Sequence, residues 1–349
     1  PEISQGMLQA MFEYQSMICR LTGMEVSNAS HYDGATSLAE AVLLALDVVE
    51  GDRGKVLLSP VVNPQYREVV KTYLRGTDAV VTGDEDPAHD LTDLARNIDD
   101  ETAAVVVQNP NFLGQLEEID SLAEAAHACG ALLIVVTDPI SLGLFKPPGA
   151  SGADVVVTDG QALGIPVSFG GPHLGIFATR KAYIRRLAGR LVGETVDTEG
   201  KRGYVLTLGT REQHIRRAKA TSNICTNAGL TALGAAVYLA TLGKAGLKQV
   251  ANLCFQKSHY AARQMREQTG FAINPAAPDK PFFKEFVVEL PVPVETVNAR
   301  LLDDFGILGG YDLGQDFPAF DRQMLIAVTE MNTREAIDRL VAGLREVTA

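Results

Sequence analysis

The chain has 349 residues, of which 43 are acidic and 31 are basic, so its formal net charge at pH 7 is −12. This acidity argues against general binding of nucleic acid, which requires an excess of Lys and Arg to displace counterions from phosphates; small molecules or proteins are the expected partners. With 46% hydrophobic residues the chain can bury a sizeable core, and its length is typical of two domains.

The four cysteines predict neither a disulfide framework nor a zinc site, because they are scattered, form no Cys-x-x-Cys pair and have no histidines at metal-ligand spacing. They are Cys19, Cys129, Cys225 and Cys254. We therefore expect no bound metal and a reducing cytoplasm.

The most apolar long run is "GLTALGAAVYLATLGKAG", which begins at Gly229. It contains several glycines, and we interpret it as too short and too weakly hydrophobic to cross a bilayer, so no membrane span is expected. The chain begins at Pro1, with no charged and then apolar leader before it. We expect that a preceding segment is missing.

Apolar runs alternate with helical patterns between residues 38 and 159. The apolar runs are continuous, which is typical of strands covered by helices on both faces. Repeated strand, helix, strand order predicts an α/β fold with a mostly parallel sheet and right-handed crossovers. We expect helices over residues 38–50, 64–75, 90–98 and 119–130, and strands over residues 55–59, 79–83, 102–109, 131–138 and 153–159.

The pattern changes near residue 207. Two long helical patterns, 210–223 and 228–268, follow without a strand between them, and the second could bridge two domains. A small α+β layer comes next, with strands expected over 282–291 and 324–330 and helices over 294–306 and 333–347. We predict a large α/β domain over residues 1–245 and a small α+β domain over residues 246–349.

The stretch "HYDGATSLAEA", from His31 to Ala41, predicts a helix start that could bind phosphate. Gly34 can adopt an unusual backbone angle, and Thr36 or Ser37 can cap the helix. The N–H groups of this turn, from Gly34 and Ala35 to Ser37, would then point at an anion together with the positive end of the helix dipole. An ordinary capped helix start is the alternative.

Asp138 ends the expected strand 131–138. A carboxylate at the carboxyl edge of a parallel sheet lies where open α/β sheets bind ligands, so Asp138 could pair with a ligand's ring nitrogen. The alternative is an Asp that starts a turn before Pro139.

A strand and a glycine-rich loop follow in "ADVVVTDGQALGIPVSFGGPHLGIFATR", Ala153 to Arg180. Together with the helix start and Asp138, this is the layout of a pyridoxal-phosphate enzyme of fold type I. In such an enzyme a lysine in this loop forms the Schiff base, and no other side chain can replace it. Here the position holds Gln161 or Ala162. Lys146 follows Asp138 too closely and Lys181 begins the next helix, so neither is a substitute.

A basic patch is expected in the helical pattern 210–223. Arginine guanidinium groups can bind carboxylates or phosphates through two parallel hydrogen bonds, so this patch could bind an anion. The alternative is a solvent-exposed helix face with local ion pairs. The patch consists of Arg211, Arg216, Arg217 and Lys219.

Three long stretches, over residues 1–41, 155–180 and 210–230, closely resemble the glycine cleavage system P-protein family. The match is to the first subunit of the form that is divided into two chains, and it extends over essentially the whole chain. That family has an additional amino-terminal segment.

The resemblance implies an oxidoreductase, glycine dehydrogenase (aminomethyl-transferring, decarboxylating). It uses pyridoxal phosphate to decarboxylate glycine and passes the aminomethyl group to the lipoyl arm of the H-protein. The homologous second subunit carries the Schiff-base lysine in a His-Lys pair, whereas this chain has Gln161 or Ala162 there. The resemblance thus implies a non-lysine subunit, inactive alone, in an α2β2 assembly that it completes.

The loop Gly170, Gly171, Pro172 and His173 is expected to reach across the subunit interface, because N–H groups of a glycine turn can approach a phosphate closely. A tight connection between two strands is the alternative. The helix start and Asp138 would then be vestigial. A second function stays open, a scaffolding or regulatory subunit that only stabilises the complex or docks the H-protein.

Overall fold

The structure is a computed structural model that describes residues 3–49, 51, 53–86, 91–220 and 222–348. The chain divides into two compact units. The first comprises Pro1–Asn109 and Glu118–Leu247, and the second comprises Pro110–Glu117 and Lys248–Ala349. The segment Pro110–Glu117, which the sequence analysis placed in the large domain, is thus part of the second unit.

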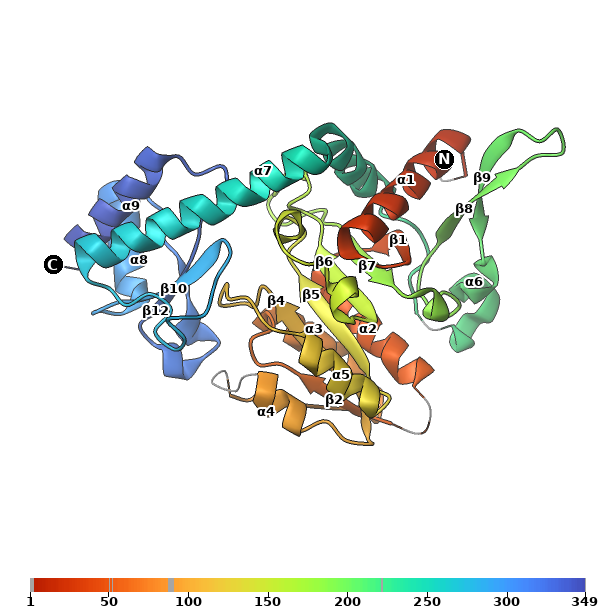
Figure 1. The fold of residues 1–349 in the computed structure, drawn as a ribbon, viewed down its shortest axis with the longest axis horizontal. Coiled ribbons are helices and arrows are strands. Elements are labelled where there is room, and N and C mark those ends of the chain that lie inside the picture. The colour runs from red at the N-terminus through yellow and green to blue at the C-terminus, as the bar shows by residue number, and fades with distance from the viewer. Residues whose placement is uncertain (1–2, 50, 52, 87–90, 221, 349) are drawn as a thin grey trace. The chain divides into compact units, whose positions relative to one another are not determined.

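A seven-stranded sheet forms the centre of the first unit, in the order β1-β7-β6-β5-β4-β2-β3 (Figure 1). The strands from β6 to β3 are mutually parallel, whereas β7 runs antiparallel to both β6 and β1. The prediction of an α/β fold with a mostly parallel sheet is confirmed. The strands are β1 (Val26–His31), β2 (Lys55–Leu58), β3 (Val80–Thr82), β4 (Thr102–Asn109), β5 (Leu132–Thr137), β6 (Val155–Asp159) and β7 (Gly175–Thr179).

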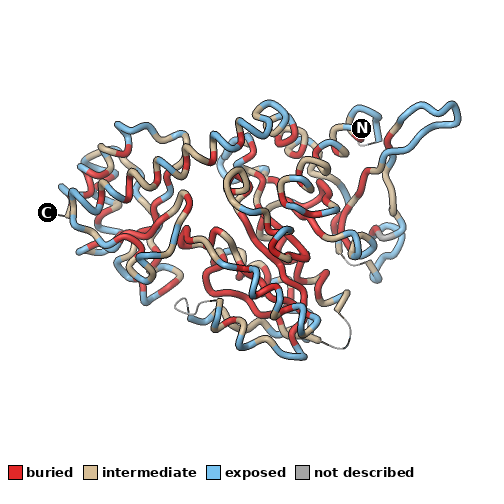
Figure 2. Tube along the Cα trace, in the orientation of Figure 1, coloured by how far each residue is buried: buried red, intermediate tan, exposed pale blue. Residues whose placement is uncertain are grey.

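The strands are continuous apolar runs because both faces of the sheet are covered. On one face, Leu38 and Val42 pack in a single cluster with strand residues such as Ile134. The next residues along the strands point the other way, and Leu133 and Val135 are also fully buried. Figure 2 shows this buried core running along the strands. The helices are α1 (Gln5–Thr22), α2 (Gly34–Val48), α3 (Pro64–Leu74), α4 (Leu91–Arg96) and α5 (Asp120–Ala128).

The region between β7 and α7 differs from the expectation. A two-stranded hairpin, β8 (Leu191–Val196) and β9 (Arg202–Thr207), was not predicted. The predicted helix over 210–223 is wrong, because backbone with a positive φ at Arg217, inside that range, interrupts it. The residues described there form short turns, η4 (Gly209–Arg211), α6 (Gln213–Arg216) and η5 (Arg217–Lys219). The basic side chains that the structure describes there are exposed and do not share one helix face.

Helix α7 (Gly229–Thr269) carries a kink at Gly243, whose φ is 59° and ψ is −174°. Its most apolar 18-residue window has a mean hydropathy of 1.4 and is 28% buried. By length and composition α7 could therefore cross a membrane, contrary to our interpretation of the sequence. This is weak evidence for a span, since core helices of water-soluble proteins pass the same test.

The second unit is an α+β layer built on a three-stranded antiparallel sheet in the order β10-β12-β11. Phe286 and Ile326 of the sheet pack with Val297, Val341 and the carboxyl-terminal half of α7 in one cluster. The segment 110–117 joins this unit through a bridge between Gln115 and Phe282. The elements are β10 (Glu285–Glu289), α8 (Val294–Phe305), β11 (Tyr311–Asp312), β12 (Gln323–Ala327) and α9 (Arg334–Val347).

Short 3-10 helices connect these elements. They are η1 (Ser141–Gly143), η2 (Pro148–Ser151), η3 (Lys181–Tyr183), η6 (Leu313–Gln315) and η7 (Pro318–Phe320).

Candidate active site

The start of α2 is capped by Asp33, not by Thr36 or Ser37 as the sequence predicted. The Thr36 N–H donates to Asp33 Oδ1 at 2.7 Å, and the Asp33 N–H donates to Thr36 Oγ1 at 3.3 Å. The Ser37 N–H donates to the Asp33 carbonyl oxygen at 3.0 Å. This reciprocal capping box satisfies amide groups that a bound phosphate would otherwise use.

Asp159, the last residue of β6, brings the helix start and the glycine-rich loop together. Its Oδ2 atom accepts a hydrogen bond from the Gly34 N–H at 3.3 Å and lies 3.2 Å from His173 Nδ1. Its Oδ1 atom accepts from the Gln161 N–H at 2.8 Å. The structure thus places Gly34, Gln161 and His173, three residues singled out in the sequence, around one carboxylate.

Tyr66 of α3 closes over Gly34. A Cβ at position 34 would collide with the Tyr66 hydroxyl and crowd the Asp159 backbone, so only glycine fits there. Burial raises the pKa of Tyr66, and the negative charges of Asp159, Asp33 and Asp138 raise it further. Three carboxylates therefore lie close enough to the Tyr66 hydroxyl to disfavour a further negative charge on it.

Asp138 acts as the start of a turn. Its Oδ1 atom accepts from the Ile140 N–H at 2.8 Å, and its carbonyl oxygen accepts from the Ser141 hydroxyl at 2.7 Å. This hydrogen bonding matches the alternative interpretation of the sequence, an Asp that begins a turn before Pro139. Its carboxylate still lies near enough to Tyr66 to raise that residue's pKa.

Gln161 and Ala162 stand where a Schiff-base lysine would be expected. The Gln161 Nε2 donates to the Ile165 carbonyl oxygen at 3.1 Å, and Ala162 is exposed. The two lysines considered as substitutes make other contacts. The Lys146 ammonium pairs with Asp120 at 2.7 Å, and Lys181 begins η3, where its N–H donates to Glu25.

The Gly170 and Gly171 N–H groups, expected to point at a phosphate, both donate to the Val167 carbonyl oxygen, at 3.0 and 3.2 Å. Both glycines have a positive φ, 109° and 140°, which other residues rarely adopt. Pro172 has no N–H to offer. The side chain of Phe169, at the tip of this loop, is fully exposed. In this chain the loop forms a tight turn with an apolar tip.

Glu40 is a buried acid that the sequence analysis missed. Burial raises the pKa of its carboxyl to about 7, although the Ser222 hydroxyl donates to it at 2.7 Å and lowers the pKa. It lines a cavity of about 330 Å³ together with Tyr73, Arg217 and Asn223. A single Glu within an apolar helical run is typical of a half-exposed helix position. The sequence therefore contains no sign that Glu40 is buried.

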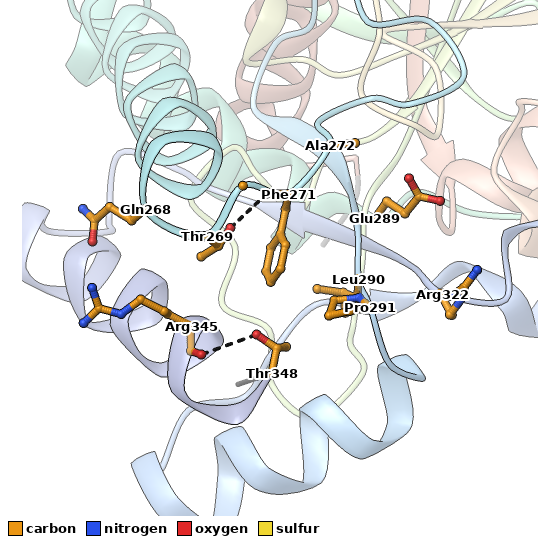
Figure 3. Close-up of a pocket in the computed structure, with 11 residues that line it drawn as sticks. Gln268, Thr269, Phe271, Ala272, Glu289, Leu290, Pro291, Arg322, Arg345 and Thr348 are labelled. Carbon is orange, nitrogen blue, oxygen red and sulfur yellow. Dashed lines mark hydrogen bonds between the residues drawn. The ribbon is translucent and has the colours of Figure 1, made fainter.

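A pocket of about 620 Å³ in the second unit lies between the end of α7, the end of β10 and α9 (Figure 3). Phe271 lines it, and the Phe271 N–H donates a hydrogen bond to Thr269 Oγ1 at 3.2 Å. Arg322 and Arg345 line it. None of its residues is a candidate from the sequence.

The described residues at the α2 start do not fit a bound pyridoxal phosphate. The phosphate would face amide groups already used by Asp33 and Asp159, and it would lie among carboxylates. No lysine stands at position 161. We also find no cluster of three His, Cys, Asp or Glu residues suited to a metal ion in the described part of the chain.

Known relatives identify the family. The model of the glycine cleavage system P-protein matches residues 1–344. "Probable glycine dehydrogenase (decarboxylating) subunit 1" of Thermomicrobium roseum is 54% identical, and the alignment covers 100% of this chain and 78% of that protein. The protein of the same name from Desulforamulus reducens is 51% identical over 100% of this chain and 77% of its own length.

Solved structures agree with these relatives. A crystal structure of glycine decarboxylase (P-protein) of the glycine cleavage system, in inhibitor-bound form, superposes with a TM-score of 0.89 at 48% identity, covering 99% of this chain and 77% of that one. An alanine–glyoxylate aminotransferase from Nostoc sp. has a TM-score of 0.68 at 18% identity, covering 98% and 87%, and shows the fold alone. The fold is that of fold type I pyridoxal-phosphate enzymes, and the chain belongs to the glycine cleavage system P-protein family.

Proposed function

We propose that this chain is the non-lysine subunit of a two-subunit glycine dehydrogenase (decarboxylating) and that it completes the active site of a homologous subunit that carries pyridoxal phosphate. The observation that carries the proposal is the absence of a lysine at the expected Schiff-base position, which holds Gln161 or Ala162. The relatives of this chain are named subunit 1 of this enzyme. The covalent cofactor would then belong to the partner.

The proposed reaction is decarboxylation of glycine and transfer of the aminomethyl group to the lipoyl arm of the H-protein. Pyridoxal phosphate, when bound in the partner, supplies the electron sink for loss of carbon dioxide. This chain would supply shape and positioning at the shared site, and Asp138 and the α2 turn from Gly34 to Ser37 would be vestigial.

The loop Gly170 to His173 is our candidate for the segment that reaches the partner's site. Solvent exposure supports this choice, because the residues at and just before the loop, Val167, Phe169 and Gly170, are all exposed on the first unit. The two glycine N–H groups are turned toward Val167, so the contribution we propose is close packing of the loop at the interface. Its backbone would approach the partner's phosphate only after opening.

An obligate partner would also account for other exposed apolar side chains of the first unit. Val196 and Val205 of the hairpin are 65% and 43% exposed, and Ile215 of α6 is 54% exposed. Obligate interfaces are large and apolar. We propose an α2β2 assembly, located in the cytoplasm, in which these side chains are covered.

The test is co-expression of the chain with its homologous partner and measurement of carbon dioxide released from glycine with H-protein present. Activity should require both subunits. Gly171→Leu should then reduce kcat with the assembly intact, as judged by size-exclusion chromatography. A matched control is Gly306→Leu, because Gly306 also has a positive φ, 60°, and has open space around its Cβ position. Gly306→Leu should leave kcat unchanged.

A scaffolding subunit is the second candidate, and one observation favours it. The Gly170 and Gly171 amides of the loop and the Gly34 and Thr36 amides of α2 donate hydrogen bonds within the chain, as expected of a subunit that only stabilises the complex or docks the H-protein. If Gly171→Leu leaves kcat unchanged in an intact complex, this second function is the correct one.

A further inference from the structure

Asp159 places a negative charge at the amino-terminal end of α2. That end of a helix carries a partial positive charge and attracts anions. In this chain the Gly34 N–H donates to Asp159 Oδ2 at 3.3 Å. The anion at the helix start is therefore part of the chain itself.

The carboxylate is held from three directions. The Gln161 N–H donates to Oδ1 at 2.8 Å, and His173 Nδ1 lies 3.2 Å from Oδ2. The Asp159 side chain is only 25% exposed. Gly34 belongs to α2, whereas Gln161 and His173 belong to the loop between β6 and β7, so the carboxylate has a fixed position between the helix and the loop.

The groups around Asp159 disfavour a second anion there. Asp33 uses the Thr36 and Ser37 N–H groups, and the Tyr66 hydroxyl closes over Gly34. The charged groups that raise the pKa of Tyr66 are the carboxylates of Asp159, Asp33 and Asp138. A phosphate dianion would be repelled by them, and His173 already pairs with Asp159.

We propose that Asp159 is a built-in anion that occupies the phosphate position at the start of α2, so that this chain excludes a phosphate-bearing cofactor independently of its missing lysine. This inference rests on the proposed function in one respect, the identity of the excluded cofactor as pyridoxal phosphate. It explains how a subunit can keep the fold of a cofactor enzyme and leave the cofactor to its partner.

The experiment measures binding of two probes, pyridoxal phosphate and inorganic phosphate, to the isolated chain by isothermal titration calorimetry. The wild type should show no saturable binding. Asp159→Gly, which vacates the position and frees the Gly34 N–H and His173, should bind both probes at least tenfold more tightly. Asp159→Asn, which is nearly isosteric, should give a smaller gain, and thermal melts followed by circular dichroism check that both variants fold.

Adding a lysine separates the two reasons for exclusion. Gln161→Lys alone should incorporate little pyridoxal phosphate after borohydride reduction, whereas Asp159→Gly with Gln161→Lys should incorporate at least tenfold more, located at position 161 by peptide mass spectrometry. Asp138→Asn is the control for charge, since it removes a nearby carboxylate and leaves the proposed occupant in place.

The proposal is overturned if the wild type binds either probe saturably at this site or if Asp159→Gly gains nothing. It is also overturned if Asp138→Asn gains as much as Asp159→Asn, or if Gln161→Lys alone is labelled as fully as the double variant. These results concern binding to the isolated chain. They are therefore independent of whether the chain supports glycine decarboxylation with its partner.

Discussion

Asp159 and Gly34 are 125 residues apart in the sequence, yet the Asp159 carboxylate accepts a hydrogen bond from the Gly34 N–H at 3.3 Å. The contact joins the carboxyl end of β6 to the amino-terminal end of α2. In open α/β sheets this edge is where ligands bind. Here a side chain of the protein itself makes the hydrogen bond at the helix start, as our proposed function expects.

The capping box predicts the first stability effect. Asp33→Ala should lower the free energy of unfolding by about 1 kcal/mol, because the Thr36 N–H loses its acceptor at the start of a buried helix. Asp33→Asn, which retains an acceptor, should lose less. Urea unfolding monitored by circular dichroism measures both. Equal stability of Asp33→Ala and the wild type would show that the cap contributes nothing.

Glu40 predicts a pH dependence. Its folded-state pKa is raised from 4.5 to about 7, so the folded state holds this proton more tightly than the unfolded state does. Stability from this group is fully present below pH 4.5 and is lost as pH rises through 7. The loss amounts to about 3 kcal/mol at most.

Glu40→Gln replaces the ionisable carboxyl with a neutral amide and should abolish the loss of stability at high pH. The variant should resemble the wild type near pH 4.5 and exceed its stability by roughly 1–3 kcal/mol at pH 8, as measured by urea unfolding across this range. Glu68→Gln, at an exposed helical position, is the matched control and should not change the pH profile. A constant difference between Glu40→Gln and the wild type at all pH values would contradict the raised pKa.

His31 predicts the opposite slope. It is fully buried and stacked on Phe177 with ring centroids 4.7 Å apart, and its ring nitrogens have no hydrogen-bond partner among the described residues. Burial lowers its pKa from 6.5 to about 3. The unfolded state therefore binds the proton first, and stability falls as pH decreases from 6.5 toward 3.

His31→Phe keeps an aromatic ring against Phe177 and removes the titration. The variant should gain stability relative to the wild type as pH falls, by on the order of 1 kcal/mol for each pH unit below 6.5. Chemical unfolding between pH 7 and 4 measures this difference. A pH-independent difference would show that His31 does not titrate with folding.

The sequence predicted most of the first unit because its signals there are local. Continuous apolar runs predicted strands such as β4 and β5, and helical periodicity predicted α2 and α3. The prediction of a helix over 210–223 failed because its apolar periodicity is weak and backbone with a positive φ at Arg217 breaks it. Buried and exposed residues do not alternate regularly along the β8–β9 hairpin beyond Val192. The sequence therefore showed no strand pattern there.

The site was predicted in part for a similar reason. The positions of Gly34, Asp138 and Gln161 follow from their places at strand ends and helix starts. The role of Asp159 was missed, because a last strand residue followed by Gly160 has the composition of an ordinary turn. Its contacts with Gly34 and His173 depend on tertiary packing, which no local pattern encodes.

The apolar tip of the glycine loop gives a test of the interface. Phe169→Ala should leave the stability of the isolated chain unchanged, because the side chain is fully exposed. It should weaken assembly with the partner at least tenfold, equivalent to about 1.4 kcal/mol, if the ring is buried at the interface. Analytical ultracentrifugation of the mixed subunits measures assembly. Wild-type affinity would place the loop outside the interface.

The most direct test of the central claim is glycine decarboxylation by three purified samples, this chain, its homologous partner, and the two together, each with pyridoxal phosphate and lipoylated H-protein. We expect that only the combined sample releases carbon dioxide from glycine and that this chain alone shows no visible absorbance of a lysine-bound cofactor. Release of carbon dioxide by this chain alone would contradict the proposed function.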